Sequence, residues 1–363
     1  MLTVGVNGRV LGKPEPTGVG RYASCLLDRL CARYADDAEF LLFGLDDPPP
    51  SLAGYDCLRT VTEPAPHSGL RAHLWEQVRL PLAIRRYDLD VVHTPAGAPP
   101  LTSTPSVATI HDISPIVHPE WFSTRYVALY RLLTVHAVRT TDRIVTVSGF
   151  ARDEIVDRYP AARGKTVPIH NGVDRERGAG SPVAALAGRD FLLFVGAMNP
   201  RKNLRTLIEA YRRYRSAAAD PLDLALAGPD RDVFASGNLP STAGVETLGF
   251  VPEAQLTWLY RNATAFVFPS LYEGFGLPIL EAMSAGTPVI TSDRGAMAEV
   301  AGDAAVLVDP GDRGALADAL ARLTGDPTER ARLADRGRER AREFTWERTA
   351  ERTMRVYRDV ANP

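Results

Sequence analysis

Residues 264–292 of the chain read TAFVFPSLYEGFGLPILEAMSAGTPVITS. An apolar run at 264–270 is followed by a Gly-Phe-Gly turn, a strong helix former after Pro278, and a second apolar run at 288–292. Proline suits the first turn of a helix, and short apolar runs bounded by turn residues suit strands. Because neither run alternates with polar residues, the stretch predicts two parallel strands, buried on both faces and joined by a helix.

The same alternation of strand and helix runs through the rest of the chain. Five strands are expected in the first half, at 2–7, 39–44, 89–94, 106–111 and 143–148. Five more are expected in the second half, at 190–196, 222–228, 264–270, 288–292 and 304–309. Two such series predict an α/β fold of two Rossmann-like, doubly wound domains that face each other across a cleft.

A polar, glycine-rich stretch at 174–189 separates the two series and predicts a linker. We therefore expect an N-terminal domain at 1–173 and a C-terminal domain at 174–343. The closing stretch 344–363 carries aromatic and apolar residues at helical spacing, which predicts a final helix.

Composition excludes several classes of protein. The 363 residues carry a formal net charge of −2, with 45% hydrophobic and 24% charged residues, which is ordinary for a globular protein and gives no support for a nucleic-acid partner. The three cysteines have neither zinc spacing nor an even disulfide count, which favours a reducing compartment. No secretory signal or membrane-spanning stretch is visible, so a cytoplasmic protein is expected.

Glu273 and Glu281 flank the Gly-Phe-Gly turn, and several kinds of site would place two carboxylates there. They could be an acid/base pair, metal ligands, clamps for sugar and ribose hydroxyls, or ordinary surface charge. The expected helix begins between them, and the amides of residues 275–277 would point out of its N-terminus as an anion site. The two carboxylates are therefore expected on opposite sides of that anion site.

Two cations stand where another helix is expected to begin, after the strand at 190–196. Arg201 and Lys202 oppose the helix dipole there, so an anionic ligand such as a phosphate is a natural explanation. Only Lys13, Lys165 and Lys202 among the 42 basic residues are lysines, which makes a lysine at this position more informative. Solvated surface charge is the alternative.

Two features of the first half also lie at the ends of expected elements. Gly18 and Gly20 lie in a loop that opens a helix, although such a pair is also common in tight turns. His111 ends the strand at 106–111, where side chains of doubly wound domains reach ligands. A histidine with a purely structural role is the alternative.

Together these motifs resemble the family 4 retaining glycosyltransferases of the GT-B superfamily. The segments that carry the resemblance are EGFGLPILEAMSAGTPVI (273–290), VGAMNPRKN (195–203), TGVGRY (17–22), HDISPIVHPEWF (111–122), NGVD (171–174), LGFVPEAQLTWLY (248–260) and FTWERTAERTMRVY (344–357). They span nearly the whole chain in the family's order. The resemblance implies an acceptor-binding N-terminal domain, a nucleotide-sugar-binding C-terminal domain, and a final helix that crosses back to the N-terminal domain.

The resemblance also implies a role for each matching residue. Those implied to be catalytic are His111 at the transferred sugar, Glu273 on the hydroxyls of the donor sugar, and Arg201 and Lys202 on the diphosphate leaving group. Those implied to bind the donor are Gly18, Gly196, Val251, Gly274, Phe275, Gly276, Leu277 and Glu281, with Glu281 on the ribose and Val251 by the base. No metal ligand is implied. Many relatives carry an arginine after the glycine of the VG turn, whereas this chain has Ala197.

As function, the resemblance implies retaining, metal-independent transfer of a mannose- or glucose-type hexose from a nucleotide diphosphate sugar, with no further cofactor. It favours GDP-mannose over a UDP-hexose and leaves a glycan, lipid-linked or small-molecule acceptor open. A nucleotide-sugar epimerase on the same scaffold and a non-catalytic sugar-nucleotide-binding module are the alternatives. A phosphorylase is disfavoured because its pyridoxal phosphate would need one of only three lysines.

Two helical segments, 68–86 and 123–139, mix leucine and aromatic residues with arginine and histidine. Both could lie on a membrane surface, which would place the protein at the inner face of the membrane. The simpler hypothesis is that their apolar faces pack on the N-terminal sheet.

Overall fold

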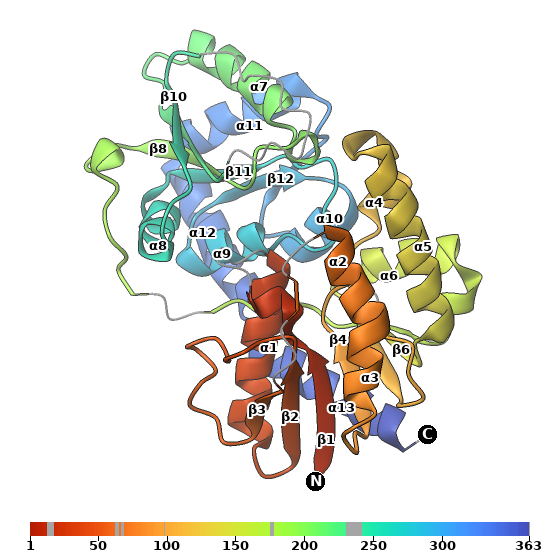
Figure 1. Ribbon diagram of the computed structural model, residues 1–363. Helices are drawn as coiled ribbons and strands as arrows, with labels where there is room; N and C mark the ends of the chain where they lie inside the picture. Colours follow the sequence, from red (N-terminus) through yellow and green to blue (C-terminus); the bar gives the residue numbers. More distant parts are fainter. Residues whose placement is uncertain are drawn as a thin grey trace. The chain divides into compact units, whose positions relative to one another are not determined.

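Two parallel sheets form the framework of the computed structural model, which describes residues 1–12, 18–61, 65–66, 69–97, 99–174, 178–229 and 242–362 (Figure 1). The chain divides into two units. The first comprises Met1–Val117, Ser123–Gly172 and Trp346–Pro363, and the second comprises His118–Phe122 and Val173–Thr345. Parts of the expected linker (175–177) and the residue before Gly18 lie outside the described residues.

The first unit is built on seven parallel strands in the order β3-β2-β1-β4-β5-β6-β7. The strands are β1 Leu2–Asn7, β2 Ala38–Phe43, β3 Leu58–Val61, β4 Val91–Thr94, β5 Ser106–Ile110, β6 Arg143–Thr146 and β7 Thr166–Pro168. Its helices are α1 Gly18–Tyr34, α2 Gly69–Leu74, a π-helix Trp75–Arg79, α3 Leu80–Ile84, α4 Ser114–Val117, α5 Thr124–Thr140, α6 Gly149–Arg158 and α13 Trp346–Ala361. Helix α13, the last of the chain, packs against α1, β4 and β5 of this unit.

The second unit repeats the plan with six parallel strands in the order β10-β9-β8-β11-β12-β13. The strands are β8 Phe191–Val195, β9 Asp223–Ala227, β10 Val245–Gly249, β11 Ala265–Phe268, β12 Val289–Ser292 and β13 Val306–Val308. Its helices are α7 Leu204–Ala217, α8 Glu253–Asn262, α9 Leu277–Ala285, α10 Gly295–Ala301, α11 Arg313–Gly325 and α12 Pro327–Ala341. Both sheets have the strand order of a Rossmann fold, as predicted.

Three strands, β3, β7 and β10, were not expected from the sequence. All three lie at sheet edges. An edge strand is paired on one side only, so it needs no continuous apolar run, and it tolerates the proline of Thr166–Pro168. Each run is short and mixed, and β10 is half-buried along most of its length. The pattern of buried strands therefore located the centres of the sheets and missed three of their four edge strands.

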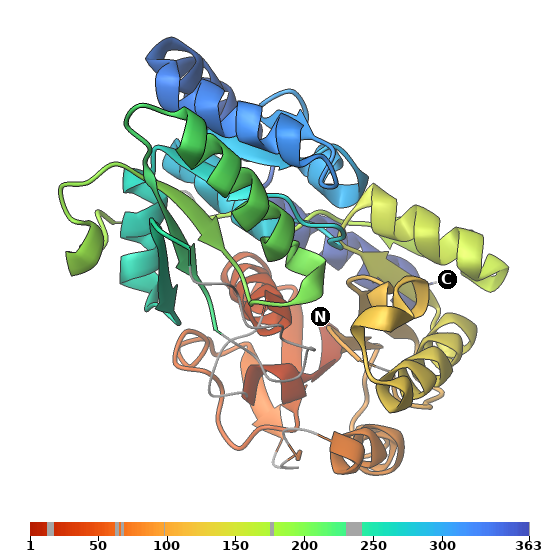
Figure 2. The same ribbon diagram turned by 90° about the horizontal axis from the view of Figure 1, so that it is seen from above.

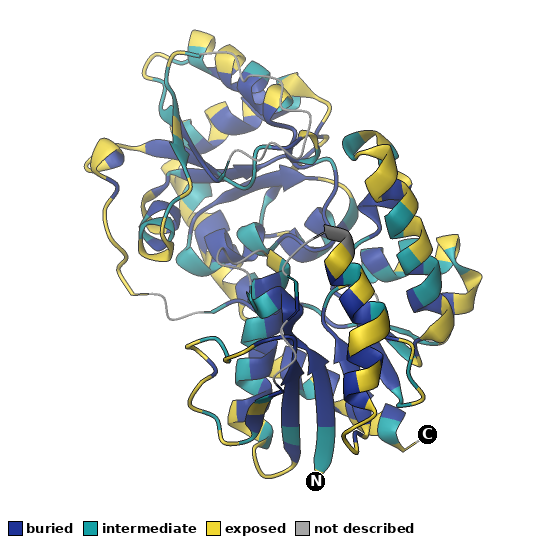
Figure 3. Ribbon diagram, viewed as in Figure 1, coloured by how far each residue is buried: buried dark blue, intermediate teal, exposed yellow. Residues whose placement is uncertain are grey.

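Successive residues of the central strands face opposite sides of the first sheet. Val92 belongs to a core cluster with Trp75, Leu80 and Ile84, so the helix at 69–84 covers that side of the sheet. The next residue, His93, points to the other side, where it meets Tyr357 of α13. Figure 3 shows the strands as mostly buried and several helices with exposed outer faces.

The helix at 69–84 and α5 run close to each other in the first unit (Figure 1, Figure 2). Gln77 and His136, one from each helix, both contact the carbonyl of Pro99, at 3.2 and 2.9 Å. Their inner faces pack on the N-terminal sheet, as the simpler hypothesis requires, since Trp75 and Ala137 belong to core clusters with strand residues.

Candidate active site

The second sheet has its topological switch point between β8 and β11, where the strand order changes direction. Ligands of doubly wound sheets bind outside the carboxyl ends of the strands at such a point. The chain leaves β8 through Gly196 and enters the short 3₁₀ helix Pro200–Lys202. It leaves β11 through the loop that carries Glu273 and then begins α9. The predicted cations and the first glutamate are therefore brought together by neighbouring strands.

Lys202 and Glu273 form a buried ion pair at this point. The Nζ atom of Lys202 lies 2.7 Å from Glu273 Oε1, and the two side chains are 8% and 10% exposed. Arg201 Nη1 lies 3.7 Å from the other carboxylate oxygen. The Lys202 ammonium also lies 4.4 Å from the ring centre of Phe268, within cation–π range. Burial alone would raise the pKa of Glu273, but the charges of Arg201 and Lys202 outweigh it and lower the pKa, so the carboxylate is ionised at neutral pH.

The loop that holds the two cations is fixed by hydrogen bonds to neighbouring loops. Asn203 adopts the left-handed conformation, with φ at 59°, and its side-chain amide donates to the carbonyls of Pro269 and Pro310 at 3.0 and 2.7 Å. The amide of Leu271 donates to the carbonyl of Arg201 at 2.8 Å. These bonds tie the loop after β8 to the loops after β11 and β13 and so hold Lys202 next to Glu273.

Helix α9 begins at Leu277, within the span where the amides of residues 275–277 were expected to form an anion site. Its N-cap is Gly276, with φ at 112°, a conformation that strains other residues, and a Cβ there would lie 3.1 Å from Ile279 Cδ1. Gly274 and Phe275 are buried, and the Phe275 ring lies edge-on to Phe344 with 6.0 Å between centroids. The glycine loop is therefore held down on the core of its unit.

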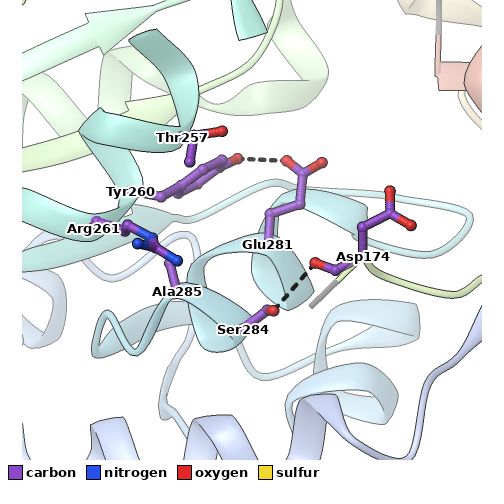
Figure 4. Close-up of a pocket in the computed structure, with 7 residues that line it drawn as sticks. All are labelled: Asp174, Thr257, Tyr260, Arg261, Glu281, Ser284 and Ala285. Carbon is purple, nitrogen blue, oxygen red and sulfur yellow. Dashed lines mark hydrogen bonds between the residues drawn. The ribbon is translucent and has the colours of Figure 1, made fainter. Parts of the chain in front are cut away.

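Glu281 lies in a different environment, at the wall of a small pocket of the second unit (Figure 4). Tyr260 of α8 donates to its Oε2 atom at 2.8 Å, and Ser284 donates to the carbonyl of Asp174 at 3.4 Å. The other lining residues are Thr257, Arg261 and Ala285. The two glutamates thus have separate partners, as their predicted positions on either side of a helix start require.

His111 follows β5 in the first unit, and its ring is held from two sides. Its Nε2 atom lies 2.9 Å from the carbonyl oxygen of Pro95, and a carbonyl can only accept, so Nε2 carries the proton. The ring meets Tyr22 edge-on at 4.8 Å between centroids. Burial lowers the pKa of His111, so the imidazole is neutral at physiological pH. Its Nδ1 atom then carries a lone pair that can accept a hydrogen bond.

The remaining predicted residues differ in how closely their surroundings constrain them. Gly18 is the first residue of α1 and is exposed, and a Cβ added there would meet nothing within 4 Å. Val251 is half-buried between β10 and α8. Gly196 has a φ of 156°, and a Cβ there would lie 3.2 Å from Lys202 Cε. No finding tests the ligand roles of these residues, which stay predictions.

Two contributors to the site were missed by the sequence analysis. Asn203 and Tyr260 both lie in quoted motifs, but neither was given a role. The asparagine signal was readable in principle, because asparagine tolerates the left-handed region better than most residues. The Tyr260–Glu281 contact joins residues 21 positions apart on two helices, and only the packed structure brings them together.

Among the described residues, no group of three or more histidine, cysteine, aspartate or glutamate side chains is arranged to hold a metal ion. Within the same residues, no helix has both the length and the apolar character needed to span a bilayer.

Both halves of the chain match families of known proteins. Residues 16–177 match the family described as Glycosyltransferase Family 4, and residues 182–340 match Glycosyl transferases group 1. The O-antigen chain mannosyltransferase B of Escherichia coli is 31% identical over 94% of this chain and 96% of its own length. The MMP α-(1→4)-mannosyltransferase of Mycolicibacterium hassiacum is 31% identical over 76% of this chain and 72% of its own length.

Solved structures share the fold. The sucrose-phosphate synthase of Thermosynechococcus elongatus superposes with a TM-score of 0.77 at 22% identity, over 99% of each chain. HepE of Anabaena, solved in complex with UDP-glucose, superposes with a TM-score of 0.72 at 17% identity, over 99% of this chain and all of its own.

Proposed function

Because this chain belongs to the family 4 glycosyltransferases of the GT-B superfamily and is a glycosyltransferase, we propose that it moves a mannose- or glucose-type hexosyl group from a nucleoside diphosphate sugar to a hydroxyl acceptor, with retention at the anomeric carbon. The observation that carries the proposal is the buried Lys202–Glu273 pair, with Arg201 beside it, at the switch point of the second sheet.

The proposed role of the two cations follows from where charge develops. Loss of a nucleoside diphosphate leaves an oxocarbenium-like sugar, and negative charge grows on the departing phosphate oxygen. Donors and charges that are fixed before the reaction stabilise such charge most effectively. Lys202 and Arg201 supply the positive charge, and the N-terminus of α9 adds its dipole. The proposed reaction therefore needs no metal ion.

Glu273 and His111 have the acceptor character that sugar hydroxyls require. An ionised carboxylate can only accept hydrogen bonds, and the neutral His111 ring accepts at Nδ1. Each is proposed to accept a hydrogen bond from a hydroxyl of the donor sugar, as the family resemblance implies. In the proposed front-face step, the anomeric C–O bond to phosphate breaks, a bond to the acceptor oxygen forms on the same face, and the acceptor proton passes to the leaving phosphate.

The donor is proposed to be GDP-mannose in preference to a UDP-hexose. Two relatives at 31% identity are named mannosyltransferases, whereas HepE was solved with UDP-glucose at 17% identity. A donor panel monitored by thermal shift tests this, because a ligand raises the apparent stability of the state it binds. Stabilisation by GDP-mannose alone supports the proposal, and stabilisation by a UDP-hexose alone overturns the donor assignment.

Transfer itself is tested with two variants and a control. Glu273→Gln and Lys202→Ala should each lose most hexosyl transfer while circular dichroism shows an intact fold. Arg205→Ala is the control, because that side chain is 88% exposed and pairs with Glu209 one turn along α7. EDTA should leave the wild-type rate unchanged. Full activity in either site variant refutes the proposal. Product formed without an acceptor would indicate an epimerase, and donor binding without nucleotide release would indicate a binding module.

We further propose that the first unit contacts the inner face of the membrane, where a lipid-linked acceptor would be presented. A glycan and a small molecule are the other acceptors to be tested. Leu74, Val78 and Leu82 follow one another at four-residue spacing on the helix at 69–84 and are 54%, 54% and 51% exposed. Arg71 and Arg79 are exposed on the same helix. Apolar side chains next to arginines suit an interface with anionic lipids.

Co-sedimentation with vesicles containing anionic lipid tests this contact. The wild type should pellet with anionic vesicles and less with neutral ones. The triple variant Leu74→Ser/Val78→Ser/Leu82→Ser should stay in the supernatant, whereas Leu307→Ser, a change at an exposed leucine of the second unit, should pellet like the wild type. Equal binding by the triple variant would exclude this helix as the contact.

A further inference from the structure

The first unit contains a buried chain of hydrogen bonds that has no part in the reaction as proposed above. Tyr357 Oη lies 2.7 Å from His93 Nδ1, His93 Nε2 lies 2.9 Å from Thr109 Oγ1, and Thr109 Oγ1 lies 3.1 Å from Tyr22 Oη. All four side chains are at most 1% exposed. We call this set of Tyr357, His93, Thr109 and Tyr22 the buried chain. It joins α13 to α1 across the neighbouring strands β4 and β5.

The buried chain is directional because its central member is neutral. Burial, together with a smaller contribution from His111, lowers the pKa of His93 to about 3, and burial raises the pKa of Tyr22 to about 12. A neutral imidazole donates from one nitrogen and accepts at the other. Tyr357 and Thr109, which contact the two nitrogens of His93, therefore have opposite hydrogen-bonding roles toward the ring.

Tyr22 is also the residue that holds His111. The rings of the two residues meet at 88° with 4.8 Å between centroids, and the histidine ring also contacts the Pro95 carbonyl. The first residue of α13, Trp346, packs on the same tyrosine at 6.2 Å. The hydroxyl of Tyr22 is thus held by its hydrogen bond to Thr109, and its ring is held by packing against Trp346 of α13. Helix α13 contributes to both contacts, through Tyr357 in the buried chain and through Trp346.

We propose that Tyr357 is a positioning residue for hexosyl transfer, which acts through the buried chain on Tyr22 and so on the ring of His111. The inference rests on the proposed function, since it gives the closing helix a part in the reaction rather than only in packing. It also accounts for two motif residues, the tyrosine of TGVGRY and the last tyrosine of the chain, to which the site assigns no role. A small displacement of a group that contacts the reacting sugar lowers the rate strongly.

The test is a double-mutant cycle that joins Tyr357→Phe to His111→Ala. In the wild-type background, Tyr357→Phe should lower kcat about tenfold and leave the KM for the donor within about twofold. In the His111→Ala background the same change should lower kcat by less than about twofold, because the ring that it positions is gone. A tenfold loss in both backgrounds, or no loss in the wild-type background, overturns the inference. Thr109→Val, which cuts the same chain, replaces Tyr357→Phe if that variant does not fold.

Tyr211→Phe is the matched control. Tyr211 is also a fully buried helical tyrosine, and its hydroxyl donates to the carbonyls of Leu222 and Gly244 at 3.0 Å each, in the second unit. It should lose stability and keep kcat within about twofold when assayed well below its melting temperature. A loss of kcat equal to that of Tyr357→Phe would mean that any buried hydroxyl matters, and the positioning role would be wrong.

A second readout does not depend on activity. Imidazole ¹⁵N spectra should show His111 as a single Nε2–H tautomer in the wild type and a shifted or averaged signal in Tyr357→Phe. Unchanged His111 resonances overturn the inference even if transfer is slow. Failure of the wild type to transfer any hexose overturns the proposed function instead, and the spectra still decide whether α13 orders the ring.

Discussion

Replacing Lys202 by methionine should destabilise the second unit by an amount that the ion pair determines. The Lys202 ammonium lies 2.7 Å from Glu273 Oε1, and neither side chain is more than 10% exposed. Its removal leaves a buried carboxylate whose remaining cation, Arg201, is 3.7 Å away. Breaking a buried pair costs about 3–5 kcal/mol, and the nearby arginine places this case at about 3 kcal/mol. For a unit of this size, that corresponds to a melting temperature about 6–12 °C lower.

The double variant Lys202→Met/Glu273→Gln should recover most of that loss. A buried ion pair and a well-packed uncharged pair of similar volume have nearly equal stability, so the double variant should melt within about 3 °C of the wild type. It should nevertheless bind nucleoside diphosphate weakly and transfer no hexose, because the charges that meet the phosphate and the sugar are gone. The double variant would then keep most of its stability while losing nucleotide binding and hexosyl transfer.

Differential scanning calorimetry and isothermal titration with a nucleoside diphosphate provide the two measurements, and Arg205→Met, at an exposed arginine of α7, is the control for loss of charge. Two results would refute the reasoning. Melting of Lys202→Met within about 2 °C of the wild type would show that the pair is not buried in solution. Additive losses in the double variant would show that the two side chains are not coupled.

Three further outcomes are expected. Burial lowers the pKa of His93 from 6.5 to about 3, so between these two pH values the unfolded chain binds more protons than the folded chain. The free energy of unfolding, measured in urea, should therefore fall by about 1.4 kcal/mol for each unit by which the pH is lowered in this range. His93→Gln should flatten that slope, and an unchanged slope would contradict the low pKa of His93. Gly228→Ala should cost about 2–3 kcal/mol in urea unfolding, since its Cβ would lie 2.1 Å from the carbonyl oxygen of Gly196; wild-type stability would refute that packing. Tyr260→Phe should weaken nucleotide binding about fivefold, as measured by titration, because Glu281 loses the hydrogen bond that orients it. Unchanged affinity would show that Glu281 does not bind the nucleotide.

The buried strands could be predicted from the sequence because burial on both faces leaves a local signature. A central strand such as Phe191–Val195 must be apolar throughout, whatever surrounds it. The edge strands Leu58–Val61, Thr166–Pro168 and Val245–Gly249 carry no such requirement and were missed. Their pairing depends on a neighbouring strand that is distant in sequence.

The candidate site divides in the same way. Glu273, Lys202 and Glu281 could be named from their positions after strands and at helix starts, because helix dipoles and strand order restrict where charge is useful. Their partners could not be named. The contact of Glu273 with Lys202 spans 71 residues, and the contact of Tyr357 with His93 spans 264.

The sequence by itself determined that the chain forms two parallel sheets and which loop ends carry charge, because strand burial, helix starts and turn chemistry are local properties. Only the tertiary structure decided that Glu273 faces two cations while Glu281 faces Tyr260, and that the last helix reaches the hydrogen bonds behind His111. The physical reason is that an ion pair or a buried hydroxyl is stable only when its partner is supplied at the correct distance, and packing brings together partners that no local pattern connects.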